Sequence, residues 1–451
     1  MNFDDLKLAA MIHFRFSLFV YAFIPDDVVV LSMETDPLDV RKDEYTNTEC
    51  LESTDSEVNV ENVENIGYKY PVLFTSKTLL ELSNCSWSRS LQAKEDVQPY
   101  LRGCKWSPDG TCCLSVVNNN GVHVTELPKE LYEGGVKSDR LIDILDSTIH
   151  VKEAGLIYDF CWYPFMHSSV PESCAWLTTR QNAPIQMWDA FDGSLRASYR
   201  GFNAVDEMEP ALSVTFNMQG DRIIAGYKKY LRTFDVERPG RDYTEHKISS
   251  PASCFATSGN LLAVGSWNTT IGLYNVSESK PLFISSHHFP NLSGGVTHMK
   301  FTPDGLKLVT GARKDHRLLI WDIRYYRRPL NILTREVNTN QRVYFDISPD
   351  GRYLVSGGTD GVLRVWDVEQ VDWKNSLDSF PLHKDCCNSV SIHPYRPILV
   401  TGSGQYHCKD PIEDTEEFIH DKTQTQTDIK YSMSTENCLV FWWTGELMNL
   451  T

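Results

Sequence analysis

The chain has 451 residues, of which 41% are hydrophobic and 23% charged, and a formal net charge of −17. This hydrophobic content excludes a wholly disordered protein, and no apolar run approaches the roughly 18–20 residues that cross a bilayer. The twelve cysteines are too few for a disulfide scaffold, and several lie in strand-like runs, which is typical of reduced, buried thiols.

Residues 1–66 form an acidic segment with 15 acidic and 4 basic residues, and we expect this segment to be a disordered tail. Its longest apolar run, Phe16–Ile24, lacks the basic start and the cleavage site of a secretory signal, so we expect neither secretion nor membrane association. Met33 opens the most acidic part, and residues 1–32 are interpreted as an alternative upstream start. A second acidic stretch, 405–437, holds 8 acidic and 3 basic residues. The rest of the chain is therefore close to neutral and can carry a basic face.

A repeat of short apolar strands organises the chain from residue 67 onward. Each unit has an apolar strand, a turn like Ser-Pro-Asp-Gly, a second strand, a polar turn, and a third strand that ends in an aromatic and a polar residue. Two copies, Met299–Asp322 and Val343–Asp367, match this pattern closely. The weaker copies have their strands and turns in the same order and at similar spacing. The weaker copies are Cys104–Glu126, Phe160–Asp189, Leu212–Asp235, Cys254–Asn275 and Asn388–Trp443.

One anchor residue marks the third strand of every copy. The anchors are Thr125, Trp188, Phe234, Tyr274, Trp321, Trp366 and Trp442. The position six residues before each anchor is polar, which places one turn in the same register in all seven copies. Those positions are Asn119, Asn182, Lys228, Asn268, Asp315, Asp360 and Glu436. Repeats of about 40–45 residues with four short strands each predict an all-β fold, a seven-bladed WD-repeat β-propeller.

The stretches between the copies predict the fourth strand of each blade. They are 140–149, 194–200, 242–249, 281–286, 329–334 and 377–382. No such stretch follows Trp443, whereas residues 70–82 are strand-like and precede the first copy. We therefore expect the N-terminal strand to close the ring on blade seven, which leaves no exposed sheet edge. The predicted propeller spans 67–445, with 405–437 as a flexible insertion in blade seven.

The motifs of common enzyme classes are missing from the sequence. It has no phosphate-binding loop, no nucleophile elbow and no histidine pair at metal-binding spacing on a helix. The Trp-Asp pairs, His298 and Asp315 are interpreted as structural hydrogen-bonding groups of the repeat. The histidines and cysteines at 383–387 and 407–408 match no zinc spacing. We expect a protein that is not an enzyme and needs no cofactor or metal.

Basic residues gather in the loops of one predicted rim face. In a WD propeller, the turns between second and third strands share a face with the connections that lead from each fourth strand to the next blade. That face collects Arg180, Lys228, Lys229, Trp267, Arg313, Lys314, Arg317, Arg335, Asn338, Asn340, Gln341, Arg342 and Lys384. Cations and amides bind phosphates and base edges, and an exposed aromatic ring stacks on an unpaired base, so we predict that this face binds RNA. For any single residue, a solvated turn or a nearby acid is the alternative.

The opposite rim carries a second group of basic and aromatic residues. Its members are Arg324, Tyr325, Tyr326, Arg327 and Arg328. Because the two groups have similar charge, comparing them separates a specific RNA surface from general electrostatic attraction.

Seven segments in all parts of the repeat carry a family resemblance. They are GCKWSPDG at 103–110, YDFCWYPFM at 158–166, WDAFDGSLRASYRGFNAVDE at 188–207, ERPGRDY at 237–243, GARKDHRLLIWD at 311–322, REVNTNQRVYFD at 335–346 and SIHPYRPILVTGSGQ at 391–405. In this order, over about residues 68–445, they resemble the telomerase Cajal body protein family of WD-repeat proteins. Tyr406 follows the last motif where the resemblance leads us to expect arginine.

The resemblance implies a non-enzymatic RNA-binding adaptor of the nucleus and its Cajal bodies. It would recognise a loop element, the CAB box, of small Cajal-body RNAs of the box H/ACA class, with box C/D RNAs as a second class. The implied partners are these RNAs, ribonucleoprotein and Cajal-body scaffold proteins, and the telomerase particle where its RNA carries the box. The chain itself is expected to be monomeric. The alternative is a protein-only WD-repeat scaffold whose basic rim binds acidic partner peptides.

Overall fold

A computed structural model of the chain describes residues 70–448, apart from 86–97, 133–135, 138, 140–141, 154, 277–281, 289–293, 326, 369–375 and 408–435. The predicted disorder of 1–66, the alternative start at Met33 and most of the predicted insertion 405–437 lie outside the described residues. Within the described part of the chain, no helix has the length and apolar character needed to cross a membrane.

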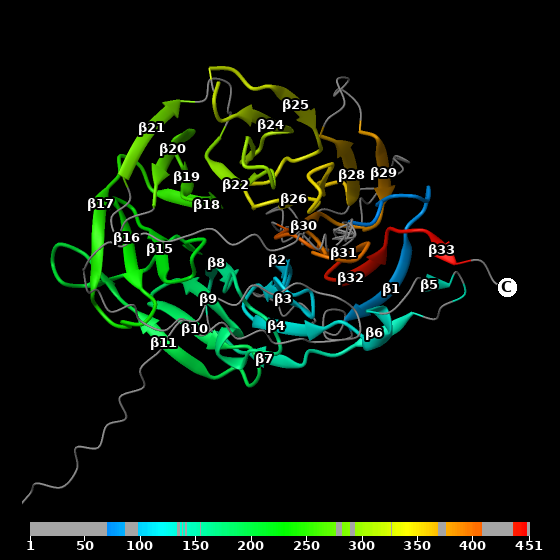
Figure 1. Ribbon diagram of the computed structural model, residues 1–451, viewed down its shortest axis with the longest axis horizontal. Helices are drawn as coiled ribbons and strands as arrows, with labels where there is room; N and C mark the ends of the chain where they lie inside the picture. The colour runs from blue at the N-terminus through cyan, green and yellow to red at the C-terminus, as the bar shows by residue number, and fades with distance from the viewer. Residues whose placement is uncertain are drawn as a thin grey trace, which may run out of the picture. The chain divides into compact units, whose positions relative to one another are not determined.

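The strands form seven sheets that follow one another around a ring, which confirms the predicted all-β, seven-bladed propeller (Figure 1). Blade one contains β2 (Leu101–Trp106), β3 (Cys112–Val117), β4 (Gly121–Glu126) and β7 (Ile149–Val151). Blade two contains β8 (Ile157–Trp162), β9 (Ala175–Arg180), β10 (Ile185–Asp189) and β11 (Leu195–Tyr199). Blade three contains β14 (Ser213–Phe216), β15 (Arg222–Gly226), β16 (Tyr230–Asp235) and β17 (Tyr243–Lys247).

The other four blades repeat this pattern of antiparallel strands. Blade four contains β18 (Ala252–Ser258), β19 (Leu261–Ser266), β20 (Thr270–Asn275) and β21 (Leu282–His288). Blade five contains β22 (Val296–Phe301), β23 (Lys307–Ala312), β24 (Arg317–Asp322) and β25 (Asn331–Thr334). Blade six contains β26 (Phe345–Ile347), β27 (Tyr353–Ser356), β28 (Val362–Asp367) and β29 (Asp378–Pro381). Blade seven contains β30 (Cys387–Ile392), β31 (Ile398–Ser403), β32 (Leu439–Trp443) and β1 (Leu80–Cys85).

Two short strand pairs lie outside the blades. β12 (Gly201–Phe202) pairs with β13 (Met208–Glu209) in the connection from blade two to blade three. β5 (Val136–Lys137) pairs with β33 (Leu447–Met448) in parallel. The described residues also include two single-turn 3-10 helices, Lys129–Leu131 and Pro171–Ser173.

The N-terminal strand closes the ring, as predicted, but it starts later than the predicted 70–82. β1 runs antiparallel to β32, with Leu80 opposite Trp443 and Asn84 opposite Val440. Residues 70–74 instead pack against blades six and seven. The Tyr70 hydroxyl donates a hydrogen bond of 2.7 Å to the His393 carbonyl oxygen.

The predicted fourth strands of blades two to six coincide with β11, β17, β21, β25 and β29. The prediction of 140–149 for blade one is wrong, because the fourth strand of that blade is β7 at Ile149–Val151. The preceding segment, β6 (Asp143–Leu145), pairs in parallel with β1 and so becomes a fifth strand of the blade-seven sheet. Apolar spacing identifies a strand, but it does not identify the sheet that the strand joins.

The repeated turn motif is held by its aspartate and its glycine. In blade one the Ser107 hydroxyl donates to Asp109 at 2.6 Å, and the Thr111 amide donates to the same oxygen at 3.1 Å. Gly110 has a φ of 74°, a left-handed conformation that side chains with a Cβ rarely adopt. The same conformation recurs at Gly305 and Gly351, so the motif sets an identical turn in three blades.

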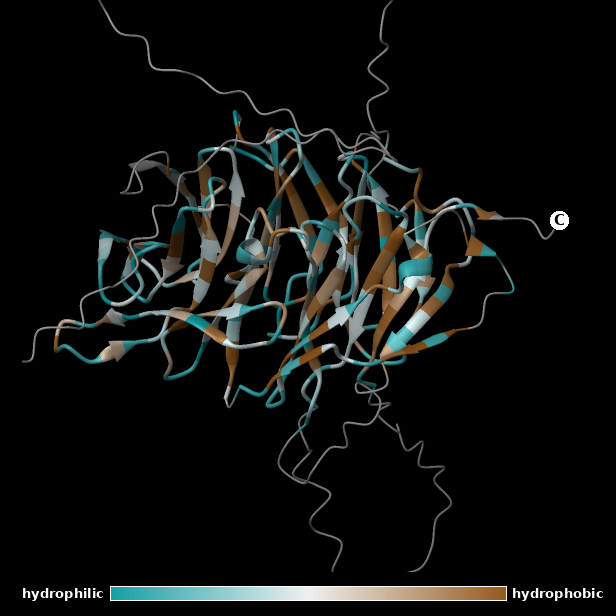
Figure 2. Cartoon of the chain, turned by 60° about the horizontal axis from the view of Figure 1, so that its bottom comes forward, coloured by the Kyte–Doolittle hydropathy of each residue, from teal (hydrophilic) through white to brown (hydrophobic). Residues whose placement is uncertain are grey.

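Three of the four anchor tryptophans, Trp188, Trp321 and Trp442, hold neighbouring strands together through an indole hydrogen bond, whereas the buried Nε1 of Trp366 has no partner among the described residues. The indole Nε1 of Trp321 donates to the Thr310 hydroxyl at 2.9 Å, and that of Trp442 donates to Thr401 at 2.8 Å. Apolar side chains fill the space between blades, and Figure 2 shows hydrophobic colour following the strands while many turns are hydrophilic. The rigid strands therefore present the turns at two opposite ends of the blades.

Candidate nucleic-acid interface

The turns form two faces of the propeller. We define the upper face as the turns between second and third strands together with the connections from each fourth strand to the next blade, and the lower face as the remaining turns. The amide of Lys314, in a blade-five turn, donates to the Thr339 carbonyl oxygen in the following connection at 3.2 Å. The Ile248 amide likewise donates to the Lys229 carbonyl oxygen at 2.8 Å. The two kinds of loop are therefore neighbours, as predicted.

An exposed tryptophan and an arginine form a platform on the upper face. Trp267 lies in the β19–β20 turn of blade four and is 45% exposed. The guanidinium carbon of Arg313, in the next blade, lies 5.4 Å from the centre of the Trp267 ring system. A cation over an aromatic ring is attracted by its negative face, which holds both groups in place. The Nε of Arg313 is buried and has no hydrogen-bond partner among the described residues.

Two glycines allow these turns to approach each other. A Cβ on Gly294 would lie 2.5 Å from the Arg313 carbonyl oxygen, and a Cβ on Gly295 would lie 2.9 Å from the Trp267 Cα. Both distances are shorter than real Cβ contacts, so larger residues would force the connection away from the turns. The Gly-Gly pair thus positions Trp267 and Arg313 side by side.

Three lysines extend the platform along neighbouring blades. Lys228 and Lys229 lie exposed in the blade-three turn, and Lys314 lies exposed in the blade-five turn. Among the described residues, no carboxylate forms an ion pair with Arg313 or with these lysines. We call Lys228, Lys229, Trp267, Arg313 and Lys314 the upper patch.

The prediction that Arg335 belongs to the exposed face is wrong. Arg335 is only 2% exposed, and its Nη1 donates to the Ser356 hydroxyl at 2.7 Å and to the Val343 carbonyl oxygen at 3.1 Å. Burial lowers the pKa of Arg335 to about 10. Its side chain braces blade five against blade six from the inside.

Arg342 is also not a free surface cation. Its Nη1 lies 3.0 Å from the Asp159 carboxylate of blade two and 3.2 Å from the Tyr344 hydroxyl. Its Nη2 donates to the Ser253 carbonyl oxygen of blade four at 2.9 Å. Arg342 therefore joins three blades across the axis of the ring.

The other predicted residues divide into paired and exposed side chains. Arg317 forms a two-point ion pair with Asp315, at 2.8 and 2.9 Å, so it stabilises its own turn. Arg180 lies 3.4 Å from the buried Glu153 carboxylate. Asn340 is exposed on the connection between blades five and six, and its predicted role in RNA binding stays a prediction.

Arg102 is a candidate residue that the sequence reasoning missed. It lies on β2 and lines a small cavity of about 20 Å³ together with Tyr158, Arg342 and Tyr344. Its Nη1 is buried without a hydrogen-bond partner among the described residues, and burial lowers the pKa of Arg102. Two cations, Arg102 and Lys105, in the mostly buried first strand of blade one were the signal that could have identified it.

A larger cavity of about 410 Å³ continues along the axis. The Lys105 ammonium donates to the Phe160 carbonyl oxygen at 2.6 Å, and Lys300 pairs with Asp346. His298 also lines this cavity, and burial holds its pKa well below the usual value, so its imidazole is neutral. The polar groups of the axis are thus largely used to join neighbouring blades.

Three potential metal ligands come together in blade seven. The ligand atoms of His383, Glu436 and Cys438 lie within 4.8 Å of one another. However, His383 Nδ1 lies 3.1 Å from Glu436, and its Nε2 lies 2.7 Å from the Thr401 hydroxyl, which also accepts from Trp442. Both imidazole nitrogens are engaged, so the arrangement fits a hydrogen-bond relay from a turn to the core better than a metal site.

The second basic group lies on the lower face. Arg324 pairs with Asp322 at 2.7 Å, whereas Arg327 and Arg328 are exposed. Tyr325 is exposed beside them, and Tyr326 lies outside the described residues. This group is far from the upper patch in the fold because it occupies the opposite ends of the strands.

Comparison with known proteins adds independent observations. A family model described as "WD domain, G-beta repeat" matches residues 279–322 and 334–367. The "Telomerase Cajal body protein 1 homolog" of Drosophila melanogaster is 40% identical over 399 residues, which are 83% of this chain and 71% of that protein. "Telomerase Cajal body protein 1" of Homo sapiens is 37% identical over 382 residues, 82% of this chain and 67% of that protein. The Bos taurus protein of the same name is 37% identical over 372 residues, 80% of this chain and 67% of that protein.

Proposed function

Since the chain belongs to the telomerase Cajal body protein family of WD-repeat proteins, we propose that it is a non-enzymatic adaptor whose upper face binds a single-stranded loop of small Cajal-body RNAs. The RNAs are those of the box H/ACA class in the first place, and the adaptor directs their particles to Cajal bodies in the nucleus. Where telomerase RNA carries the same loop element, the telomerase particle is a further client. Ribonucleoprotein and Cajal-body proteins complete the set of proposed partners.

The upper patch is the observation that carries this proposal. Trp267 offers a ring face for an unpaired base, and stacking on an aromatic side chain contributes about 1–3 kcal/mol per base. Arg313, Lys314 and the two lysines of blade three surround it with cations that no acid neutralises within the described residues. Phosphates of a strand that crosses blades three to five would meet these cations.

A loop fits this surface better than a duplex does. In an RNA duplex the base edges lie in a deep, narrow groove that side chains cannot reach, whereas the bases of a loop can turn outward and stack. The upper patch has one exposed aromatic ring among turn cations, which suits an unpaired nucleotide with flanking phosphates.

Substitution of the upper patch tests the proposal. We expect W267A to weaken binding of a fluorescently labelled box H/ACA hairpin carrying the CAB box by about 5- to 150-fold, because the stacking energy is removed. We expect the triple variant K228A/K229A/K314A to weaken binding and to reduce the slope of log Kd against log salt by about 0.7 for each phosphate that the variant no longer neutralises. Both quantities come from fluorescence anisotropy at four salt concentrations.

The lower-face triple R324A/R327A/R328A is the matched control, because it removes the same charge. It should change Kd less than twofold, and all variants should keep the wild-type melting temperature. Equal losses of affinity in the two triples would show that binding is general electrostatic attraction. If neither the W267A variant nor the upper triple loses affinity, and crosslinking in cells recovers only proteins, the alternative of a protein-only scaffold is correct.

A further inference from the structure

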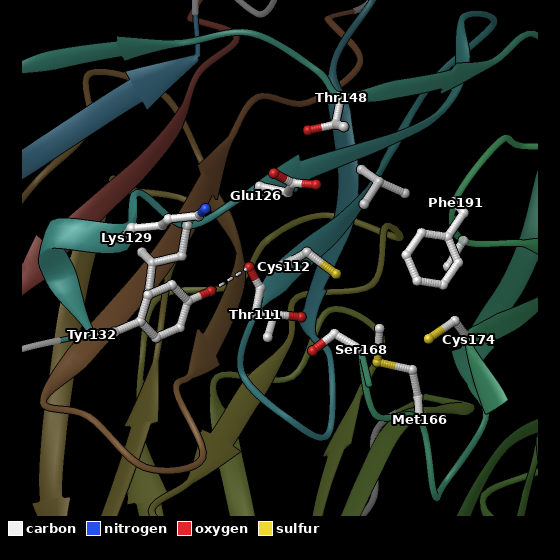
Figure 3. A pocket seen from close by; sticks show the side chains of 13 residues that line it. Thr111, Cys112, Glu126, Lys129, Tyr132, Thr148, Met166, Ser168, Cys174 and Phe191 are labelled. Carbon is white, nitrogen blue, oxygen red and sulfur yellow. Dashed lines mark hydrogen bonds between the residues drawn. The ribbon is translucent and has the colours of Figure 1, made fainter. Parts of the chain in front are cut away.

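A cleft of about 380 Å³ opens on the lower face between blades one and two (Figure 3). Figure 3 shows Met166, Cys174 and Phe191 of blade two facing Cys112 of blade one across it. These four side chains and Val124 give the cleft an apolar interior. Phe191 stands at the rim and is 56% exposed, so its ring is accessible to a ligand.

One hydrogen bond between blades one and two and one within blade one fix the walls of this cleft. The Asp109 carboxylate accepts from the Ser168 amide at 2.8 Å, which ties the blade-one turn to the blade-two loop. The Tyr132 hydroxyl donates to the Thr111 carbonyl oxygen at 2.9 Å and holds the opposite wall (Figure 3). The cleft is therefore formed before any ligand arrives, so a ligand need not induce it.

The interior of the cleft is uncharged, whereas its rim is acidic. Burial raises the pKa of Cys112 to about 12, so this thiol is neutral. Glu126 is an exposed carboxylate in the lining of the cleft. Glu130, Glu172 and Asp192 are exposed carboxylates within two residues of the lining residues Lys129, Cys174 and Phe191. Lys129 is the one exposed lysine or arginine among the described lining residues. No cation forms an ion pair with Glu126, Glu130 or Glu172 within the described part of the chain.

We propose that this cleft binds an extended basic segment of a partner protein, with one large apolar side chain inserted beside Phe191 and flanking lysines or arginines facing the acidic rim. Opposite charges across an interface favour association, and an apolar anchor in a preformed pocket supplies most of the affinity. The proposal depends on the fold and not on the proposed RNA role.

The charges disfavour the other occupants. A nucleic acid would bring phosphates against the acidic rim, which is repulsive at this distance. A second copy of the chain, packed face to face through the same cleft, would bring the same carboxylates together. A basic peptide avoids both of these charge repulsions. A cleft of this size holds one or two large side chains rather than a folded domain.

Three labelled nonapeptides test the proposal by fluorescence anisotropy with the full chain. The first has a central leucine flanked by lysines and arginines, the second replaces the leucine with glycine, and the third replaces the basic residues with glutamates. We expect the first peptide to bind at least about tenfold more tightly than the second, since burial of a leucine side chain contributes about 1.5–3 kcal/mol. We expect no measurable binding of the third.

Variants of the cleft locate the binding site. A190W fills the cleft and should abolish binding of the first peptide, and E126K should weaken it at least about fivefold. The matched control is E237K, which reverses an exposed acid on the lower face of blade three. Melting temperatures confirm that each variant is folded, and binding of the RNA hairpin should be unchanged in all three.

The proposal is overturned if the first peptide does not bind, if all three peptides bind equally, or if E237K weakens binding as much as E126K does. Loss of RNA binding in E126K would also contradict it, because the two surfaces would then not be separate. Failure of the RNA proposal itself is recognised independently by the W267A variant.

Discussion

At the scale of single residues, Arg342 shows that a cation in an upper-face connection can serve stability instead of binding. It contacts Asp159 of blade two and the Ser253 carbonyl oxygen of blade four. Its removal would leave the Asp159 carboxylate buried without a countercharge. We therefore expect R342M to lower the free energy of unfolding by about 3–5 kcal/mol, measured by urea denaturation.

Two further variants distinguish this effect from a general loss of charge. R324M removes a cation that pairs with Asp322 on an exposed turn, and it should leave the free energy of unfolding almost unchanged. The double variant R342M/D159N should be more stable than R342M alone, because it removes the unpaired charge. An R342M protein as stable as the wild type would refute the bracing role.

His393 gives the propeller a sensitivity to acid at the contact between blades seven and one. Its Nε2 donates to the Gly110 carbonyl oxygen at 3.0 Å, and its Nδ1 accepts from the Tyr395 and Arg396 amides at 3.0 and 2.9 Å. Protonation of Nδ1 would break two hydrogen bonds. Burial is the main cause that lowers the pKa of His393 to about 4 from its usual 6.5. Between about pH 6.5 and pH 4, the His393 imidazole therefore binds a proton in the unfolded chain but stays neutral in the folded chain.

The sign of the pH effect follows from this difference. The stability that the neutral imidazole provides is complete above pH 6.5 and is lost as the pH falls from 6.5 towards 4. We expect His393 to account for about 2 kcal/mol of the stability lost between pH 7 and pH 4.5. The variant H393Q should be less stable at pH 7, but its stability should fall by that much less on acidification. An identical fall in both proteins, measured by urea denaturation at the two pH values, would assign the acid sensitivity elsewhere.

The sequence was sufficient to predict which loops carry the candidate site. It was not sufficient to predict which partner each side chain contacts. The repeat register placed Lys228, Trp267 and Lys314 on one face, and the structure has them there. Arg342 and its partner Asp159 lie 183 positions apart, so no local pattern connects them. In the sequence, Arg335 cannot be distinguished from an exposed loop arginine, because it comes directly after a strand. It is buried because blades five and six pack around it.

At the scale of secondary-structure elements, β1 is the strand on which closure depends. It covers β32 on the outer side of blade seven, and Leu82 and Cys85 are fully buried in the cluster that joins blades seven and one. A chain that begins at residue 86 should expose the edge of β32 and the apolar surface beneath it. We expect this truncation to be insoluble or to lose its cooperative melting transition.

A chain that begins at residue 67 is the matching control, and we expect its melting temperature to lie within about 2 °C of the full-length value. Equal melting temperatures for the two truncations, measured by circular dichroism, would show that the ring does not need β1.

The insertion between β31 and β32 starts and ends at one point of the fold. The Asp385 carboxylate accepts from the imidazole of His407 at 2.8 Å and from the amide of Glu436 at 3.4 Å. A short linker can therefore join the two ends without strain. We expect replacement of 408–435 by four glycine and serine residues to leave the melting temperature within about 2 °C. A larger decrease would show that the insertion supports blade seven.

The elements could be predicted well because each blade repeats one local pattern of strand, turn and anchor. The aspartate and glycine of the Ser-Pro-Asp-Gly turns determine their conformation locally, whatever the neighbouring blades do. The partner of a strand is different, because it depends on distant segments. The apolar spacing of β6 predicted a strand of blade one. In the structure, the backbone of β6 pairs with β1 of blade seven instead.

At the scale of the whole propeller, the two faces carry opposite charge at the two proposed binding sites. The upper patch holds four cations, and the cleft on the lower face is bordered by acids. Ligands on the two faces do not compete for space, and at physiological salt the Debye length is about 8 Å, so they hardly interact electrically. We expect a saturating RNA hairpin to change the Kd of the basic leucine peptide less than twofold in anisotropy titrations. A tenfold change would reveal coupling between the faces.

The pairing of Leu80 with Trp443 also determines when the propeller ring can close while the chain is being synthesised. β1 (Leu80–Cys85) is synthesised about 350 residues before β32 (Leu439–Trp443). At about 5–20 residues per second, β1 waits on the order of 20–70 seconds for its partner. During this interval six blades can form, but the edge of the seventh stays open to other chains. A nascent chain stalled before Leu439 should therefore be a substrate for chaperones, and the ring can close once β32 has been synthesised and pairs with β1.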